Sequence, residues 1–219
     1  MIPKNIKAVI FDMDGVLMLS CGCHESAFRK VLSGIGIEME DYQEYAGMRT
    51  DEVFYSELIK NKYCDCSETN IRNLTKKKRD IANAMLKENL CIADGTEKVI
   101  KKLSEKYRIG LASSASPENV DLFLNKSGLR SYFNCIINGT MVNKAKPAPD
   151  IYLAAVEKLN VKKEECVVVE DAVSGIKSAK NAGLTVFAVS GTDSIENLTA
   201  AGADKIINSL KELLEKYEN

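Results

Sequence analysis

Five short segments of β-branched and other apolar residues recur along this chain, and stretches with helical spacing separate them. Residues 167–169 are three consecutive valines, apolar on both faces, which is typical of a parallel strand that helices cover on each side. This alternation predicts an α/β fold with a doubly wound, Rossmann-like parallel sheet. The predicted strands are residues 6–11, 107–112, 134–137, 166–169 and 184–189, followed by an edge strand at 205–207 and a closing helix at 210–217.

The interval between the first two predicted strands indicates an inserted domain. It holds about a hundred residues, whereas a crossover between parallel strands needs only about a dozen. Its apolar residues recur at helical spacing and it contains no β-rich segment, so a small helical bundle is expected. The prediction is a helical cap domain over residues 18–86, an α/β core made of residues 1–17 and 87–219, and short hinges near 18–21 and 87–94.

The charge of the chain is balanced, with 30 basic residues against 31 acidic ones and a net charge of -1 at pH 7. This balance gives no field that would steer the chain onto nucleic acid or anionic lipid, so neither is expected as a partner. No stretch reaches the ~20 apolar residues of a membrane span, and Asp12 and Asp14 interrupt the N-terminal apolar run, which excludes a signal-peptide core. We expect a cytoplasmic protein, monomeric because no long heptad seam is present. The basic run at 76–79 is expected to be a solvated helix face.

The seven cysteines are an odd number in a chain large enough to fold without disulfide bonds, so reduced thiols are the simpler expectation. Cys135 and Cys166 lie in predicted strands, where they would serve as small hydrophobic residues. A zinc site is the alternative, although the C-x-C spacing of this chain differs from the usual C-x-x-C. Its candidate ligands would be Cys21, Cys23, His24, Cys64 and Cys66.

Acidic pairs stand at the ends of two predicted strands. Asp12 and Asp14 follow the first strand, next to Gly15, and Glu170 and Asp171 follow the fourth. An open parallel sheet collects its ligand at the carboxyl ends of its strands, so the four carboxylates are expected to meet at one edge. Turn formation or helix capping would explain either pair alone. Polar residues follow four of the strands, which favours a common site.

Polar residues also follow the second predicted strand. They are Ser113, Ser114, Ser116 and Asn119, whose side chains and neighbouring backbone amides can bind an anionic substrate. Ser116 also suits an N-cap, with Pro117 in the first helical turn, but capping does not account for the serine pair at the strand end.

Two lysines, Lys144 and Lys146, follow the third predicted strand and precede Pro147. Proline stiffens the turn that would direct a lysine towards the same edge of the sheet, whereas a surface position is the alternative.

The residue types at these strand ends together suit phosphoryl transfer. Mg²⁺ prefers about six oxygen ligands, so Asp12 and Asp171 could hold it and leave places for water and a phosphate oxygen.

A carboxylate that attacks phosphorus forms an acyl phosphate and divides one difficult displacement into two easier ones. The cation and the ammonium of Lys146 would offset the repulsion between such a nucleophile and the phosphate. A second acid with a raised pKa would protonate the leaving alcohol and later activate water.

These elements carry a family resemblance. They read Asp-Met-Asp-Gly-Val at 12–16, Ser at 113, Lys-Pro-Ala-Pro-Asp at 146–150 and Glu-Asp-Ala-Val-Ser-Gly-Ile at 170–176. In this order and spacing, over nearly the whole chain, they resemble the haloacid dehalogenase superfamily of phosphatases, and within it the β-phosphoglucomutase-like branch with a helical cap.

The resemblance implies a role for each matching residue. Asp12 would be the nucleophile and a magnesium ligand, and Asp14 the general acid and base, with its main-chain carbonyl on magnesium. Ser113 and Lys146 would bind the phosphate. Lys144, two residues earlier, does not match the motif. The magnesium site would be completed by Glu170 and Asp171.

Within the cap the resemblance points to three substrate contacts. His24 stands where relatives with a sugar-phosphate substrate often have a histidine, Arg49 lies in what looks like a substrate-binding cap loop, and Lys78 would correspond to a lysine of the mutase. The alternatives are a surface histidine at a helix start, an exposed salt bridge of Arg49 with Asp51 or Glu52, and a solvated basic run.

The leading hypothesis is a magnesium-dependent phosphatase that hydrolyses a small phosphate monoester, expected to be a sugar phosphate, through an aspartyl-phosphate on Asp12. The closest alternative is a phosphohexomutase with the same chemistry. The loop at 47–49 looks one residue shorter than expected for the mutase, which favours hydrolysis. A phospho-accepting signalling module is the third, but it would have no use for an inserted cap. One departure is Leu19-Ser20, where many relatives have Asp-Ser or Asp-Thr.

Overall fold

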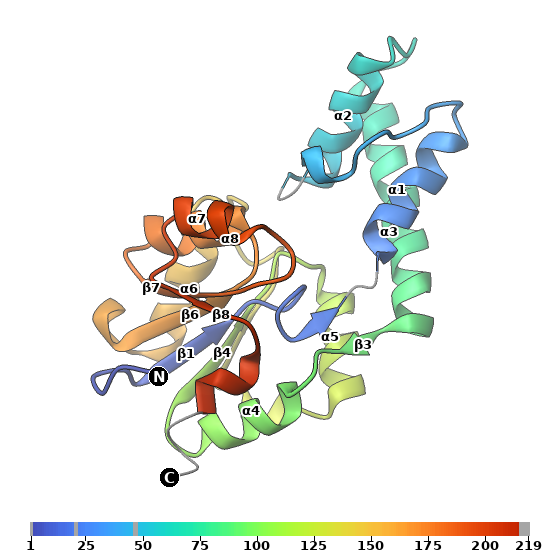
Figure 1. The fold of residues 1–219 in the computed structure, drawn as a ribbon. Helices are drawn as coiled ribbons and strands as arrows, with labels where there is room; N and C mark the ends of the chain where they lie inside the picture. The colour runs from blue at the N-terminus through green and yellow to red at the C-terminus, as the bar shows by residue number, and fades with distance from the viewer. Residues whose placement is uncertain (1, 20–21, 46–47, 215–219) are drawn as a thin grey trace. The chain divides into compact units, whose positions relative to one another are not determined.

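The computed structural model describes residues 2–19, 22–45 and 48–214 of the chain (Figure 1). The chain divides into two compact units, one made of residues 1–19 and 91–219 and the other of residues 20–90. The first unit contains the sheet, and the second is helical in the part that the structure describes. Where the sequence analysis places a hinge from residue 87, helix α3 (Glu68–Asn89) continues to residue 89 instead.

Six parallel strands form the sheet of the first unit. Their order in space is β5-β4-β1-β6-β7-β8, and each neighbouring pair runs parallel. Phe11 at the end of β1 is level with Leu111 of β4 and Val169 of β6. The predicted doubly wound α/β fold is therefore confirmed. The strands are β1 (Ala8–Phe11), β4 (Arg108–Ala112), β5 (Cys135–Ile137), β6 (Cys166–Glu170), β7 (Thr185–Val189) and β8 (Lys205–Ile207).

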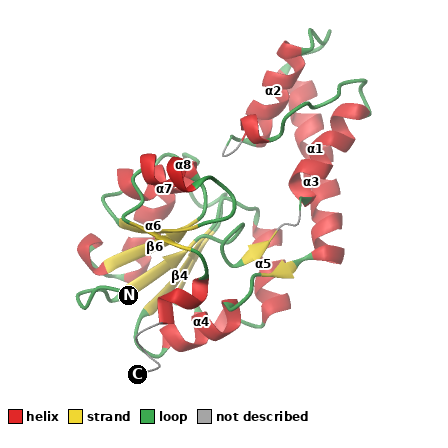
Figure 2. Cartoon of the chain, in the orientation of Figure 1, coloured by secondary structure: helices red, strands yellow, loops and turns green. Residues whose placement is uncertain are grey.

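Helices cover both faces of the sheet (Figure 2). Val168 packs in one cluster with apolar residues of α6 (Asp150–Leu159), α7 (Val173–Asn181) and α8 (Ile195–Ala200). Val167 and Val169, whose side chains alternate to the other face, are equally buried. The helices α4 (Thr96–Ser104) and α5 (Pro117–Ser127) lie on that side. Burial on both faces explains why the strand reads as a continuous apolar run.

A tight turn after β1 leads into a short antiparallel ribbon. The N–H of Gly15 donates to the carbonyl of Met18 at 2.7 Å, and the N–H of Met18 donates to the carbonyl of Met13 at 2.9 Å. Gly15 has a φ of +83°, and a Cβ there would lie 1.7 Å from Oδ2 of Asp171, so a side chain is excluded on two grounds. The ribbon pairs β2 (Met18–Leu19) with β3 (Cys91–Ile92), which keeps both segments with the first unit.

The helical unit is built around its longest helix, α3, against which α1 (Cys23–Ser33) and α2 (Thr50–Lys60) both pack. Ser67 caps α3 by accepting a hydrogen bond from the N–H of Asn70. A short 3₁₀ helix, η1 (Gln43–Tyr45), precedes α2. The core of this unit is formed by Phe28, Val31, Leu32, Ile37, Met39, Tyr45, Val53, Phe54, Leu58 and Leu74.

Two expectations about surface segments need correction. Within the basic run at 76–79, Lys78 is buried while its neighbours are exposed, because it follows the buried Leu74 by one helical turn. The predicted closing helix is a 3₁₀ helix, η4 (Leu210–Leu214), and residues 215–217 lie outside the described part. Across the described ranges, no helix has both the length and the apolar character needed to cross a bilayer.

Candidate active site

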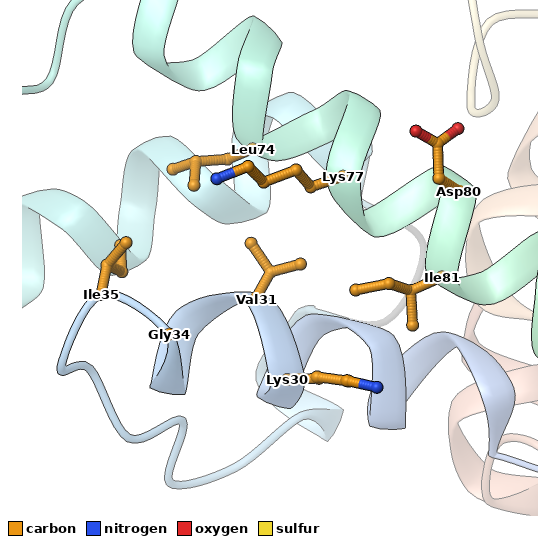
Figure 3. A pocket seen from close by; sticks show the side chains of 8 residues that line it. All are labelled: Lys30, Val31, Gly34, Ile35, Leu74, Lys77, Asp80 and Ile81. Carbon is orange, nitrogen blue, oxygen red and sulfur yellow. The ribbon is translucent and has the colours of Figure 1, made fainter.

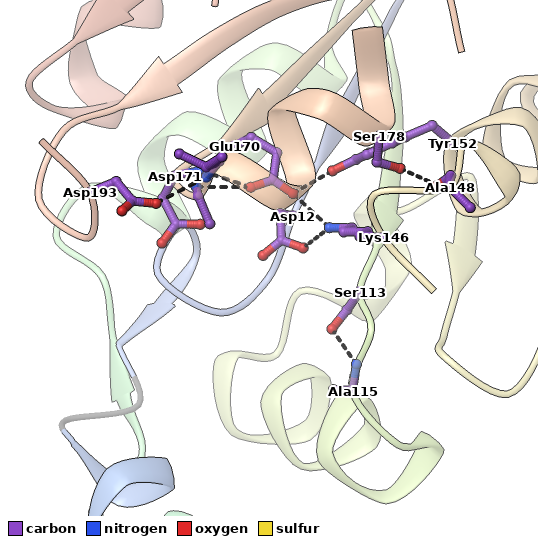
Figure 4. Close-up of polar contacts among 12 residues, drawn as sticks. Asp12, Ser113, Ala115, Lys146, Ala148, Tyr152, Glu170, Asp171, Ser178 and Asp193 are labelled. Atoms are coloured by element: carbon purple, nitrogen blue, oxygen red, sulfur yellow. Dashed lines mark hydrogen bonds and ion pairs between the residues drawn. The ribbon is translucent and has the colours of Figure 1, made fainter. Parts of the chain in front are cut away.

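The carboxyl ends of three neighbouring strands bring the predicted core residues to one edge of the sheet (Figure 4). Asp12 follows β1, Ser113 follows β4, and Glu170 ends β6. The strand order reverses at β1, because the chain continues through β4 and β5 on one side of it and through β6 to β8 on the other. Open α/β sheets form their ligand crevice at such a switch point.

Three buried carboxylates meet at this edge. Oxygen atoms of Asp12, Glu170 and Asp171 lie within 4.8 Å of one another, and the three residues are only 7%, 1% and 4% exposed. The ammonium Nζ of Lys146 lies 2.5 Å from Oδ1 of Asp12 and 2.6 Å from Oε1 of Glu170. If all three carboxylates are ionised, this ammonium leaves two negative charges uncompensated, which is the charge of one divalent cation.

Crowding of these groups shifts their pKa values. Burial raises the pKa of Asp12 to about 7, against the opposing effect of Lys146 and with a contribution from Glu170. Burial, together with Glu170 and Asp12, also raises the pKa of Asp171 well above its ordinary value. Burial, the largest influence, acts in the same direction on Glu170, but Lys146 together with the hydrogen bonds from Tyr152 and from the N–H of Asp171 lowers its pKa. Glu170 is therefore the anion paired with the ammonium, and protons or a cation compensate the other two.

The loop that carries Lys146 is held against α7. The hydroxyl of Ser178 donates to the carbonyl of Ala148 at 2.6 Å, and the amide of Asn181 donates to the carbonyl of Pro147 at 3.0 Å. The peptide bond between Lys146 and Pro147 is cis. Burial alone would lower the pKa of Lys146, but the two adjacent carboxylates reverse that effect and raise it well above the ordinary value.

Two further residues, which the sequence analysis did not single out, contact the carboxylates. Tyr152, on α6, donates its hydroxyl hydrogen to Oε1 of Glu170 at 2.7 Å. Thr192, after β7, donates to Oδ2 of Asp171. The strand-end rule applied to β7 would have found Thr192, whereas Tyr152 reads from the sequence as an ordinary buried aromatic residue of a helix.

The other predicted core residues lie near the same edge. Asp14 is partly buried, and its charge contributes to the raised pKa of Asp12. Ser113 is 1% exposed, and its Oγ accepts a hydrogen bond from the N–H of Ala115 at 3.0 Å. Ser116 occupies the N-cap position of α5, without a capping bond from its side chain. Ser114 is exposed, and Asn119 is buried in the first turns of α5.

The three residues predicted to contact substrate from the helical unit do not form one group. Nδ1 of His24 lies 3.0 Å from Nζ of Lys78, which also stands 4.4 Å from the centroid of the Phe28 ring. Burial and the charge of Lys78 lower the pKa of His24 to about 3. Arg49, at the N-cap of α2, makes an exposed salt bridge through Nε with Oδ1 of Asp51 at 3.2 Å. This salt bridge is the alternative that the sequence left open.

A cavity of about 380 Å³ in the helical unit lies between α1 and α3 (Figure 3). Apolar side chains of Val31, Ile35, Leu74 and Ile81 line it, and Lys30, Lys77 and Asp80 stand at its rim. None of its lining residues belongs to the predicted site.

Among the described residues, the side chains that gather closely enough to hold a metal ion are those of Asp12, Glu170 and Asp171, so the described cysteines and His24 form no zinc cluster. Cys21, one of the candidate zinc ligands, lies outside the described residues. Cys64, Cys66, Cys91, Cys135 and Cys166 are free thiols, and Cys135 and Cys166 are buried in strands as expected.

Comparison with known proteins matches residues 9–189 to the family described as haloacid dehalogenase-like hydrolase. The chain is 31% identical to a phosphorylated carbohydrates phosphatase of Thermotoga maritima, over 95% of this chain and 100% of the relative. It is also 31% identical to a β-phosphoglucomutase of Bacillus subtilis, over 95% of this chain and 92% of the relative. The solved structure of CbbY from Rhodobacter sphaeroides in complex with phosphate superposes with a TM-score of 0.79 at 28% identity, over 95% of this chain and 96% of that one.

Proposed function

Because this chain belongs to the haloacid dehalogenase-like hydrolase family, we propose that it is a magnesium-dependent phosphatase of a small phosphate monoester, with a sugar phosphate as the substrate class. The observation that carries this proposal is the buried group of Asp12, Glu170 and Asp171 around the ammonium of Lys146. Such a group suits the two tasks of the reaction, because it can hold a cation and can present one carboxylate to phosphorus.

The donor set fits Mg²⁺, which prefers carboxylate and carbonyl oxygens. Asp12 and Asp171 would hold the ion through their carboxylates and Asp14 through its main-chain carbonyl, while Glu170 adds to the negative charge of the site. When bound, the ion supplies charge stabilisation at the oxygens of the transferring phosphate.

Asp12 is the nucleophile of the proposed reaction. Its carboxylate oxygen forms a bond to phosphorus, the bond from phosphorus to the alcohol oxygen breaks, and Asp14 gives its proton to that oxygen. Asp14 then takes a proton from water, whose oxygen attacks phosphorus and releases inorganic phosphate and free Asp12. Lys146 offsets the negative charge that gathers during both steps, as its position beside Asp12 suggests.

The remaining predicted residues would bind the substrate. Ser113 would contact the phosphate with Lys146, and Ser114, Ser116 and Asn119 would bind other parts of the ester. We further propose that the unit at residues 20–90 is the cap that selects the substrate. Its candidate contacts are His24, Arg49 and Lys78.

The second candidate function is that of a phosphohexomutase, favoured by the 31% identity to the β-phosphoglucomutase of Bacillus subtilis. A mutase forms the same aspartyl-phosphate but returns the phosphoryl group to a sugar instead of to water. Part of the loop at 47–49, on which the sequence argument against a mutase rests, lies outside the described residues.

A panel of several dozen phosphorylated metabolites, incubated with the full chain in MgCl₂ and in EDTA, tests the proposal. We expect phosphate release in MgCl₂ but not in EDTA, and the highest rates with sugar phosphates. The Asp12→Asn variant should release no phosphate, while its circular dichroism spectrum should match that of the wild type. A folded, active Asp12→Asn would refute the assignment of the nucleophile. In a separate arm, β-glucose 1-phosphate is supplied with a bisphosphate primer, where glucose 6-phosphate as the product identifies a mutase and free phosphate a phosphatase.

A further inference from the structure

Tyr152 is the largest fully buried side chain of the described chain, and its hydroxyl reaches the acidic group at the strand ends. It lies in the first turn of α6, immediately after the loop that carries Lys146. Its hydroxyl is 2.7 Å from Oε1 of Glu170, and the centroid of its ring is 4.9 Å from Nζ of Lys146. One side chain therefore contacts both members of the ion pair, through the hydroxyl and through the ring face.

Glu170 accepts four hydrogen bonds. Oε1 accepts from Nζ of Lys146 at 2.6 Å and from the hydroxyl of Tyr152 at 2.7 Å. Oε2 accepts from the N–H groups of Asp171 and Ala172 at 2.9 Å and 3.2 Å. A carboxylate offers about four lone-pair sites, so these donors occupy all of them.

The carboxylate of Glu170 is also confined by close packing. A Cβ at Gly175, in the first turns of α7, would lie 1.7 Å from Oε1 of Glu170 and 2.0 Å from its Cδ. The carboxylate is thus packed against the helix backbone on one side and bonded to Tyr152 on another. A side chain fixed in this way can hold its ammonium partner in one place.

We propose that Tyr152 is a positioning residue that acts through Glu170 to hold the ammonium of Lys146 beside Asp12, and that Glu170 works as the anchor of Lys146 and not as a direct ligand of the cation. The inference rests on the proposed function and deepens it. Neighbours that orient a reactive group are typically worth about ten- to a hundredfold in activity or metal affinity. Tyr152 should affect the step in which charge develops, because Lys146 acts on that step.

Tyr152→Phe tests the proposal, since it keeps the ring beside Lys146 and removes the hydroxyl alone. We expect kcat to fall about tenfold, the typical effect of an orienting neighbour, while KM stays near the wild-type value. Calorimetric titration of the substrate-free protein with MgCl₂ should give a nearly unchanged Kd. The matched control is Tyr132→Phe in the 3₁₀ helix η2 (Arg130–Tyr132), which precedes β5 and so lies at the opposite, amino edge of the sheet, and it should leave kcat unchanged.

The calorimetry also separates an anchor from a ligand. Glu170→Gln should weaken MgCl₂ binding much less than Asp171→Asn does, and equal losses would overturn the anchor role. A Tyr152→Phe variant with wild-type kcat and only a lower Tm would show a purely structural hydroxyl and overturn the positioning role. If Glu170→Gln does not fold, the kinetics of Tyr152→Phe decide. If the wild-type chain hydrolyses no ester at all, the proposed function fails. The MgCl₂ titrations would then still decide whether Glu170 is a ligand of the cation or the anchor of Lys146.

Discussion

The ammonium of Lys146 lies 2.5 Å from Oδ1 of Asp12, and the two side chains are 8% and 10% exposed. These residues are far apart in the sequence, and the carboxyl ends of β1 and β5 are separated by β4 in the sheet. The contact therefore depends on the loop after β5 reaching back across the edge of the sheet, where Ser178 and Asn181 hold it.

Lys146→Met should impair both activity and stability. Methionine has a similar length but no charge, so kcat should fall about 10²- to 10³-fold, as when one charge-stabilising donor is removed. Removing one partner of a buried ion pair typically costs about 3–5 kcal/mol, and we expect urea unfolding at pH 8 without Mg²⁺ to show a loss of this size. Lys144→Met is the matched control, because Lys144 is exposed two residues earlier, and it should behave as wild type. Equal effects of the two variants would contradict the assigned role of Lys146.

Gly175→Ala should reduce activity even though alanine favours a helix. In an exposed helix interior this change stabilises by roughly 0.5–1 kcal/mol. Here the added Cβ would lie 1.7 Å from Oε1 of Glu170, so the carboxylate must move away from Lys146 and from Tyr152. Phosphate release and the Tm should both fall. Gly34→Ala, at the C-cap of α1 in the other unit, should keep wild-type activity, and an unimpaired Gly175→Ala would show that the position of Glu170 does not matter.

Stabilisation by Mg²⁺ should increase with pH. Burial raises the pKa of Asp12 to about 7, so without a cation the folded chain binds more protons than the unfolded chain between the ordinary pKa and 7. The contribution of Asp12 to stability is therefore present at low pH and is lost as pH rises through 7. Mg²⁺ must displace that proton, so the rise in Tm on adding MgCl₂ should be larger at pH 8 than at pH 5.5. Scanning calorimetry measures it, with Asp12→Asn as the control, and a Tm increase independent of pH would contradict the prediction.

His24 should remain neutral in the folded chain down to strongly acidic pH. Burial and the charge of Lys78 lower its pKa to about 3, below the ordinary value of 6.5. The unfolded chain therefore binds the extra proton first, and stability should fall as pH drops from 6.5 towards 3. His24 is the only histidine, so one imidazole signal in the NMR spectrum reports it without assignment. A signal that titrates near 6.5 would contradict the prediction, and His24→Gln should make unfolding less dependent on pH.

Much of the fold could be predicted from the sequence because the strands are buried on both faces. Runs such as Val167–Val169 carry that information locally, and the long interval after β1 indicates the insertion. The family expected from the four motifs is confirmed by the match over residues 9–189. Strand ends were also informative for the site, since Asp12, Lys146, Glu170 and Asp171 come together as the parallel topology requires.

The sequence did not reveal contacts that depend on how a helix packs, because they join side chains that are far apart in the sequence or on successive helical turns. Tyr152 has the helical spacing of a core residue, and only the packing of α6 against the sheet shows that its hydroxyl reaches Glu170. Lys78 sits in a run of charged residues, and the helical turn that connects it to Leu74 decides its burial. Leu210–Leu214 forms a 3₁₀ helix that packs on α4 with Leu210, Leu213 and Leu214 buried, and apolar spacing does not distinguish such a helix from an α-helix.

The ribbon of β2 and β3 has an evolutionary consequence. Met18 pairs with Ile92 and Leu19 with Cys91, so the points at which the chain leaves and re-enters the first unit are adjacent. An insert of different length or architecture can be exchanged between two adjacent attachment points without altering the register of any strand in the six-stranded sheet. If the inserted unit selects the substrate, as we propose, selection can change specificity while the residues at the strand ends are inherited unchanged.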